Sequence, residues 1–250
     1  MSRKPLVAGN WKMYTDPASG SDLASKIKTS LADCSWADLA VFPPYTSLSA
    51  VLLALKGTSI HVGGQNLHWE KEGAFTGEIS AVMLKSLGCN MVLIGHSERR
   101  TYFGETDERV NLKLVAALSA GLKPIVCIGE SLEQRESGIT EKVVEHQLLD
   151  GLKNFTNLEN FVIAYEPVWA IGTGKNATPE QAGEVHKFIR GLVAKGWGTQ
   201  AADSIRILYG GSVKPDNAAQ LWSKDDIDGF LIGGASLKAE SFTAIADAVK

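Results

Sequence analysis

Residues 161–174 read Phe-Val-Ile-Ala-Tyr-Glu-Pro-Val-Trp-Ala-Ile-Gly-Thr-Gly, and they contain a strand, its end and a loop. The apolar run Phe161–Tyr165 predicts a strand that is buried on both faces of a sheet. Glu166 is the first charged residue after this run, and the strand must stop at Pro167 because proline cannot donate to a sheet ladder. The apolar tip Val168–Ile171, followed by glycines, predicts a flap over the carboxylate.

Similar apolar runs recur along the whole chain, and amphipathic segments separate them. The runs are Leu6–Ala8, Leu39–Phe42, Ile60–Gly63, Met91–Ile94, Pro124–Ile128, Phe161–Tyr165, Ile207–Tyr209 and Phe230–Ile232. The segments with helical spacing are Ser21–Leu31, Ser80–Leu87, Thr106–Ser119, Glu141–Leu152, Thr178–Val193, Pro215–Leu221 and Ser241–Val249. Buried strands alternating with helices indicate a parallel sheet. Eight such units predict one α/β domain over residues 1–250, a (β/α)₈ barrel of eight parallel strands surrounded by helices.

An open, doubly wound sheet is the alternative architecture for this alternation of strands and helices. The turn after the first strand, Gly9-Asn10-Trp11-Lys12, lacks the glycine fingerprint of dinucleotide-binding sheets. No low-complexity linker interrupts the alternation. The closed barrel is therefore the favoured prediction.

Composition excludes several classes of function. Charged residues make up 21% of the chain and the net charge is −3, so there is no basic field for nucleic acid. No apolar stretch reaches the length that spans a membrane, and the amino terminus runs directly into a strand. The chain has three cysteines, an odd number, which suggests reduced thiols and a cytoplasmic location. Cys127 is expected in the core. The histidines are dispersed, so we expect no metal site.

The segment Gln65–Glu78 is too long and too aromatic for a simple turn. Loops of this length in compact domains are usually functional. Its apolar residues Leu67, Trp69 and Phe75 are expected to be exposed and to require a partner.

In a (β/α)₈ barrel, catalytic residues lie where the strands end. The first strand ends at Asn10 and Lys12, the fourth at His96 and the sixth at Glu166. The seventh and eighth strands end at Gly210-Gly211-Ser212 and Gly233-Gly234. Glycine turns that enter helices present backbone N–H groups to anions. The turns after the seventh and eighth strands of such barrels are the usual position of a phosphate.

The polar residues at the strand ends suit proton removal from carbon. Glu166 is a base on a rigid strand, and the flap behind it would exclude water. His96 precedes a helix start at Ser97, whose backbone amides would keep the imidazole uncharged and able to donate a hydrogen bond. Most lysines are solvated surface charges, but Lys12 beside Asn10 would stabilise a phosphate and a developing oxyanion.

Four motifs, in this order and spread over the whole chain, resemble those of triosephosphate isomerases. They are Gly9-Asn10-Trp11-Lys12-Met13, Gly95-His96-Ser97-Glu98-Arg99-Arg100, Tyr165–Lys175 and Tyr209-Gly210-Gly211-Ser212-Val213. The resemblance implies the interconversion of dihydroxyacetone phosphate and glyceraldehyde 3-phosphate through an enediolate in glycolysis and gluconeogenesis. This reaction needs no cofactor.

The resemblance also implies roles for individual residues. Glu166 would be the base, His96 the uncharged electrophile, and Lys12 and Asn10 would bind and polarise the substrate. The phosphate would be held by the backbone amides of Gly172, Ser212, Gly233 and Gly234, and Ser97 and Glu98 would support the catalytic groups from behind. A homodimer is implied in which loop 65–78 inserts into the partner and brings Thr76 close to the partner's site.

Two other classes of function remain open. One is a catalytically silent barrel that only binds or supports, against which the intact Lys12, His96 and Glu166 argue. The other is a barrel enzyme that forms a Schiff base, which needs a desolvated lysine on an inner strand. None of the predicted strand interiors contains a lysine.

Overall fold

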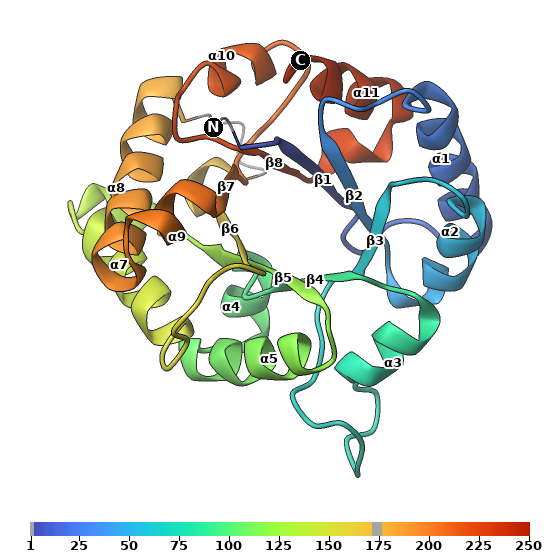
Figure 1. The fold of residues 1–250 in the computed structure, drawn as a ribbon, viewed down its shortest axis with the longest axis horizontal. Coiled ribbons are helices and arrows are strands. Elements are labelled where there is room, and N and C mark those ends of the chain that lie inside the picture. Colours follow the sequence, from blue (N-terminus) through green and yellow to red (C-terminus); the bar gives the residue numbers. More distant parts are fainter. Residues whose placement is uncertain (1–2, 172–176) are drawn as a thin grey trace.

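The computed structural model describes residues 3–171 and 177–250. Within these residues, eight parallel strands close into a barrel in chain order, and β8 pairs with β1 (Figure 1). The strands are β1 (Leu6–Asn10), β2 (Asp38–Phe42), β3 (His61–Gly64), β4 (Met91–Ile94), β5 (Lys123–Ile128), β6 (Val162–Tyr165), β7 (Arg206–Tyr209) and β8 (Gly229–Ile232). The predicted fold class is confirmed.

Helices surround the barrel and cover the outer face of its strands (Figure 1). The α-helices are α1 (Pro17–Ser30), α2 (Leu48–Ala54), α3 (Ala81–Leu87), α4 (Ser97–Phe103), α5 (Asp107–Ser119), α6 (Leu132–Glu136), α7 (Thr140–Gly151), α8 (Pro179–Trp197), α9 (Thr199–Ser204), α10 (Ala218–Trp222) and α11 (Ala239–Asp247). Short 3₁₀ helices are η1 (Tyr45–Ser47), η2 (Val168–Ala170) and η3 (Gly234–Leu237).

Each predicted strand and helix is present, and all but Met91–Ile94 have shifted ends. Helix α1 starts at Pro17 rather than at Ser21, because Asp16 caps it and accepts a hydrogen bond from the Ser19 N–H at 2.8 Å. Helix α10 starts at Ala218 rather than at Pro215. There the Asn217 side chain accepts from the Lys214 N–H at 2.8 Å and holds residues 214–217 in a turn.

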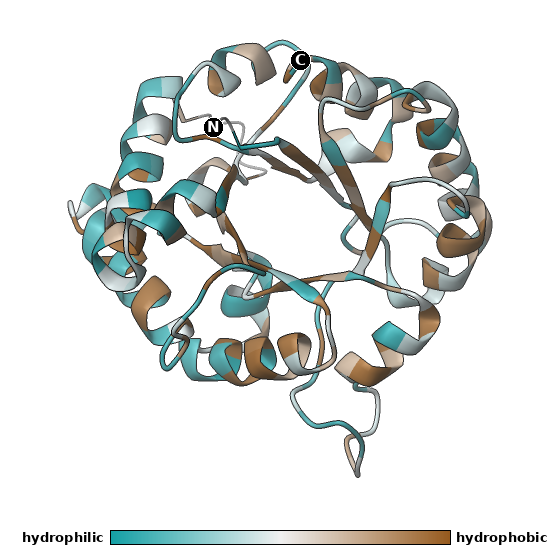
Figure 2. Ribbon diagram, viewed as in Figure 1, coloured by the Kyte–Doolittle hydropathy of each residue, from teal (hydrophilic) through white to brown (hydrophobic). Residues whose placement is uncertain are grey.

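The apolar residues form two cores. An inner cluster fills the barrel, and its members are Leu6, Ala8, Ala40, Phe42, Met91, Leu93, Ile125, Cys127, Val162, Ala164, Leu208 and Leu231. The alternate residues of the same strands face outward and pack against the helices. Figure 2 shows strands that are mostly brown inside a ring of helices that carry both teal and brown residues. Cys127 is fully buried, as expected.

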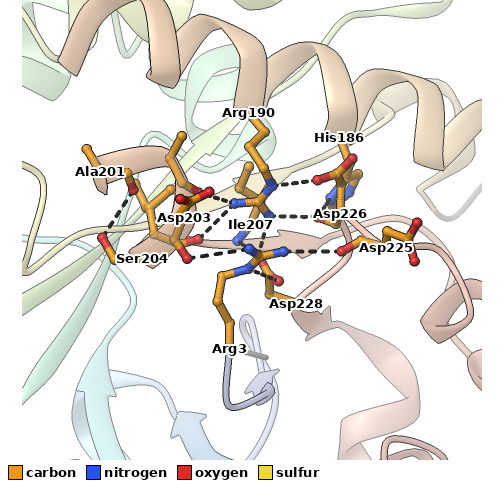
Figure 3. A network of polar contacts seen from close by, with 12 residues as sticks. Arg3, His186, Arg190, Ala201, Asp203, Ser204, Ile207, Asp225, Asp226 and Asp228 are labelled. Carbon is orange, nitrogen blue, oxygen red and sulfur yellow. Dashed lines mark hydrogen bonds and ion pairs between the residues drawn. The ribbon is translucent and has the colours of Figure 1, made fainter. Parts of the chain in front are cut away.

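A network of ion pairs ties the barrel together at the starts of its strands (Figure 3). Asp228, which directly precedes β8 and is 3% exposed, accepts from the Arg190 Nη2 of α8 at 2.6 Å and from the Ile207 N–H of β7 at 2.8 Å. It also pairs with the Arg3 Nε at 2.5 Å, next to β1. The network therefore joins one helix to three neighbouring strands.

Loop 65–78 projects from the body of the barrel between β3 and α3 (Figure 1). The expectation that Leu67 is exposed is wrong, because this side chain is fully buried in the outer core. The base of the loop is closed there by the His68 N–H, which donates to Ile79 O at 2.8 Å. Trp69 is half-buried, and its ring stacks on His68. Phe75 at the tip is 43% exposed, as predicted.

Among the residues that the structure describes, no helix combines the length and hydropathy needed to span a membrane.

Candidate active site

One cavity of about 730 Å³ opens at the carboxyl ends of the strands. It brings together the predicted residues Asn10, Lys12, His96, Glu166, Ser212, Gly233 and Gly234. Gly172 falls outside the described residues, as does the flap beyond Ile171. The sequence reading missed other residues that line this cavity, among them Tyr14, Asp216, Lys238 and Ser241.

Glu166 and His96 meet across the floor of the cavity. Glu166 follows β6 directly, and its N–H donates to Ile128 O at 2.8 Å, which continues the barrel ladder by one residue. Its Oε1 lies 2.9 Å from the His96 Nε2, and its Oε2 accepts from the Ser97 N–H at 2.9 Å. Glu166 is 2% exposed and His96 is 6% exposed, so the pair is shielded from solvent.

The hydrogen bonds of His96 fix its tautomer. His96 caps α4, and its Nδ1 accepts from the Glu98 N–H at 3.2 Å. A ring nitrogen that accepts carries no proton, so the proton of the uncharged ring is on Nε2, which faces Glu166. Burial lowers the pKa of His96, but Glu166 and Glu98 together raise it by more, so the net shift is upward. Burial raises the pKa of Glu166, but His96, the Ser97 N–H and Lys12 together lower it by more, so the net pKa is lowered.

Lys12 is held in an unusual backbone conformation beside this pair. Its φ of 50° lies in the left-handed region, where a side chain other than glycine is uncommon. Hydrogen bonds on both sides fix it there, because the Lys12 N–H donates to the Asn10 Oδ1 at 3.0 Å and the Lys12 O accepts from the Gln65 Nε2 at 2.7 Å. The Lys12 Nζ contacts the Glu98 Oε1 at 2.5 Å. Sequence reasoning missed Gln65, although it directly follows β3.

The two glycine turns differ from each other. The turn after β8 leads directly into η3, whose first residue is Gly234. The expectation that the turn after β7 also enters a helix is wrong, since α10 begins only at Ala218 and a turn intervenes. In that first turn, the Gly210 N–H donates to Tyr165 O at 2.7 Å. The Gly233 α-carbon faces Lys12, whose Cε would lie 3.3 Å from a β-carbon there, so this turn and the lysine share one side of the cavity.

Glu130 is a buried carboxylate that the sequence reading missed. It is fully buried behind β6, accepts from the Trp169 Nε1 at 2.8 Å and the Tyr165 hydroxyl at 3.0 Å, and pairs with the Arg135 Nη1 at 3.1 Å. It thereby anchors the start of the flap to the end of β5. Its position two residues after an apolar strand was the available signal.

The described strands contain one lysine, Lys123, which is the first residue of β5 and does not line the cavity, so the site offers no strand lysine for a Schiff base. Across residues 3–171 and 177–250, no three His, Cys, Asp or Glu side chains are grouped closely enough to hold a metal ion.

Comparisons with known proteins agree with this geometry. The family model described as triosephosphate isomerase matches residues 5–249. The chain is 58% identical to the triosephosphate isomerase of Carboxydothermus hydrogenoformans, covering 97% of this chain and 98% of the relative. It is 54% identical to that of Chlorobium phaeovibrioides, covering 98% and 99% of the two chains. The crystal structure of triosephosphate isomerase from Bartonella henselae is similar, with a TM-score of 0.90, 42% identity and 98% coverage of both chains.

Proposed function

The chain belongs to the triosephosphate isomerase family, and from this premise we propose how its own residues carry out the reaction. It is an isomerase that interconverts dihydroxyacetone phosphate and D-glyceraldehyde 3-phosphate in glycolysis and gluconeogenesis. The observation that carries the assignment of residues is the buried contact between Glu166 and His96 at the floor of the cavity. In this proposal residues 1–250 act as one domain.

The phosphate binds at the glycine turns after β7 and β8. Ser212, Gly233 and Gly234 line the cavity on this side, so their backbone amides are proposed to bind the phosphate, and Lys12 adds a positive charge beside them. Gly172, outside the described residues, is assigned to the same group on the resemblance alone. Anchoring the phosphate fixes the position of the carbons to be deprotonated.

Substrate binding must separate Glu166 from His96. In the free enzyme the Nε2 proton of His96 is directed at Glu166, and this proton is the donor that a substrate carbonyl needs. Glu166 is also held by the Ser97 N–H. When the triose enters, its carbonyl takes the Nε2 hydrogen bond and the carboxylate turns toward the carbon. The upward contribution of Glu166 to the pKa of His96 is then reduced, which favours the uncharged ring.

The reaction moves one proton between the two carbons and one between the two oxygens, and the carbonyl shifts to the neighbouring carbon. Glu166 takes a proton from the carbon beside the carbonyl, and the enediolate forms as the electron pair moves to oxygen. His96 donates its Nε2 proton to one enediolate oxygen and removes the proton of the other. Glu166 returns its proton to the neighbouring carbon. Lys12 and Asn10 stabilise the negative oxygen, and Glu98 holds the Lys12 ammonium in place.

The flap keeps water out while the enediolate exists. Its described start, η2, is anchored through the contact of Trp169 with Glu130, and Ile171 reaches the cavity wall. An enediolate phosphate exposed to water can expel its phosphate, so this cover protects the product as well as the rate.

The enzyme is proposed to be a homodimer in the cytoplasm, joined through loop 65–78. Thr76 and Phe75 lie at the exposed tip of this loop. Among the other large exposed apolar side chains, several belong to the segment after β1, to α3 and to α4, and these include Met13, Val82, Met83, Tyr102 and Phe103. Met13 is 95% exposed and Tyr102 is 75% exposed, which is the surface that a partner would cover. The free cysteines fit a reducing compartment.

The test of the base is proton exchange at carbon. Dihydroxyacetone phosphate is incubated in heavy water with the enzyme and followed by proton NMR, and turnover is measured in parallel. We expect Glu166→Gln to lower both rates by about 10²–10⁴ or more, because a general base is lost. Glu166→Asp, which retains a carboxylate on a shorter side chain, should keep part of the activity. Near-full turnover by the folded Glu166→Gln enzyme would refute the assignment.

A further inference from the structure

Gly95 lies at the point where β4 leaves the barrel sheet. The register of β4 and β5 pairs Ile94 with Val126, so the next pair in the ladder would be Gly95 and Cys127. The chain turns away instead, with Gly95 at a φ of 77°, and His96 follows. The peptide groups of Gly95 thus lose their partners in the sheet just before the residue that polarises the substrate.

Arg100 replaces the missing ladder bonds. Its Nε donates to Gly95 O at 2.8 Å and its Nη2 donates to Cys127 O at 3.2 Å, so one guanidinium joins the ends of two neighbouring strands. Asp107 fixes the third nitrogen, Nη1, at 2.6 Å. A planar guanidinium with several donors can make these bonds together, whereas an ammonium on a flexible stem cannot reproduce this geometry.

Glu105 holds the other side of the same residue. Its Oε1 accepts from the Gly95 N–H at 3.1 Å. Its Oε2 is fixed by the Arg99 Nε at 2.7 Å and by the Lys113 Nζ at 2.9 Å. The carboxylate side chain is only 2% exposed, and its pKa is lowered because these two cations outweigh the effect of burial.

Both groups come from the segment that begins at His96 itself. Arg100 is in α4, and Glu105 lies two residues after it ends, while the first turn of α4 supplies the Glu98 N–H that bonds to the His96 Nδ1. The segment therefore folds back on Gly95 and holds its peptide groups on both sides, next to the imidazole. The space beside Gly95 is tight, since a β-carbon there would lie 3.0 Å from the Val110 Cγ2 and 3.1 Å from Cys127 O.

We propose that Arg100 and Glu105 are positioning residues that fix the location and the tautomer of the His96 imidazole by holding the Gly95 peptide from both sides. Neither residue lines the cavity. The proposal rests on the role assigned to His96 above. Without the Arg100 guanidinium, Gly95 O and Cys127 O lose their donors, α4 moves relative to β4, and the Glu98 N–H no longer meets Nδ1.

The test compares Arg100→Gln with Arg100→Lys. A small displacement of a catalytic group costs on the order of 10²-fold, so we expect Arg100→Gln to lower kcat by about 10- to 100-fold with KM little changed. Arg100→Lys should recover part of this loss, because an ammonium can donate to one of the two carbonyls. Arg109→Gln is the matched control. It removes an exposed arginine that donates to Gly104 O at 3.1 Å, and it should leave kcat unchanged.

Nitrogen-15 NMR of the His96 imidazole gives a readout that is independent of turnover. In the parent enzyme, one nitrogen should carry the proton and Nδ1 should show the signal of an unprotonated acceptor. In Arg100→Gln, the two signals should approach each other as the tautomers mix, and their titration should shift in pH. Three charged groups face the ring and enter that titration, namely Glu166, Glu98 and Lys12.

Glu105→Gln separates the hydrogen bond from the charge. The amide oxygen still accepts from the Gly95 N–H, so the imidazole signals and kcat should stay near those of the parent, while the loss of the pairs with Arg99 and Lys113 lowers the unfolding temperature. Folded Arg100→Gln and Arg100→Lys enzymes with unchanged His96 signals and unchanged kcat would overturn the proposal. If His96→Gln itself kept full activity, the role of His96 would fail instead, while the tautomer test would still decide what Arg100 does.

Discussion

Gly129 and Glu166 approach each other so closely that a β-carbon on Gly129 would overlap the carbonyl oxygen of Glu166. Gly129 follows β5 and Glu166 follows β6, so the two strand ends meet at the base of the cavity. Glycine is required here by close contact between backbones, because any side chain would push the catalytic carboxylate out of place.

Gly129→Ala is therefore expected to lower the free energy of unfolding by about 3 kcal/mol, the cost of a severe overpacking. It should also lower kcat, because relief of the overlap moves Glu166. Chemical denaturation and steady-state kinetics measure the two effects. Gly191→Ala, within α8 and with nothing near its added β-carbon, is the control and should gain about 0.5–1 kcal/mol. Equal changes in the free energy of unfolding and in kcat for the two variants would contradict this account of the strand ends.

Lys12→Met should lower kcat/KM by about 10²–10³, the usual effect of losing a donor to a developing oxyanion. It should also weaken competitive inhibition by inorganic phosphate, since the same ammonium lies beside the phosphate turn. Lys26→Met is the control, because Lys26 makes an exposed pair with Asp22 within α1 at 2.7 Å. An unaltered inhibition constant for phosphate in Lys12→Met would separate Lys12 from the phosphate site.

His186 should make the protein less stable in mild acid. It is fully buried between Tyr165 and Tyr209, and burial lowers its pKa to about 3 from the ordinary 6.5. The unfolded chain therefore binds a proton that the folded chain does not, so stability is complete above pH 6.5 and falls as the pH decreases toward 3. The loss attributable to this residue is about 2 kcal/mol at pH 5.

Denaturation curves at pH 7.5 and pH 5 measure this effect. His186→Phe should be less stable at pH 7.5, because Asp226 O loses the 3.2 Å hydrogen bond from the ring, but its stability should depend less on pH. The prediction fails if the free energy of unfolding falls by the same amount in the variant and the parent between the two pH values.

Phe75→Glu should weaken the proposed dimer, since a charge would replace an apolar side chain at the tip of the inserting loop. Sedimentation velocity at micromolar concentration should show monomer, with reduced activity. Leu149→Glu, on α7 at another side of the barrel in Figure 1, has nearly the same exposure, 42% against 43%, and should stay dimeric. A stable and active monomer of the parent chain would refute the dimer itself.

The strands could be predicted from the sequence because each is a continuous apolar run, and Met91–Ile94 has the same bounds in the structure as in the prediction. Once the barrel is known, Lys12, His96 and Glu166 must share one end of it, since parallel strands all end on the same face. The cavity confirms that they lie together.

Other features depend on partners that are distant in sequence. Glu130 reads as a surface charge until Tyr165 and Trp169 are placed beside it. The start of helix α4 at Ser97 was predicted, but its extent was not, because the helix is too short and too polar to show an apolar period and is stabilised by the contacts of its own arginines. Leu67 is buried because the base of its loop pairs with Ile79, which local composition does not reveal.

The ion pairs of Asp228 and the reacting groups lie at opposite ends of the same strands, with the inner apolar cluster between them. Separate sets of side chains thus provide stability and catalysis. Substitutions among the arginines and aspartates at the starts of the strands should therefore change thermal stability and leave turnover as it was. The unfolding temperature of the barrel can thus change without any change at its catalytic residues.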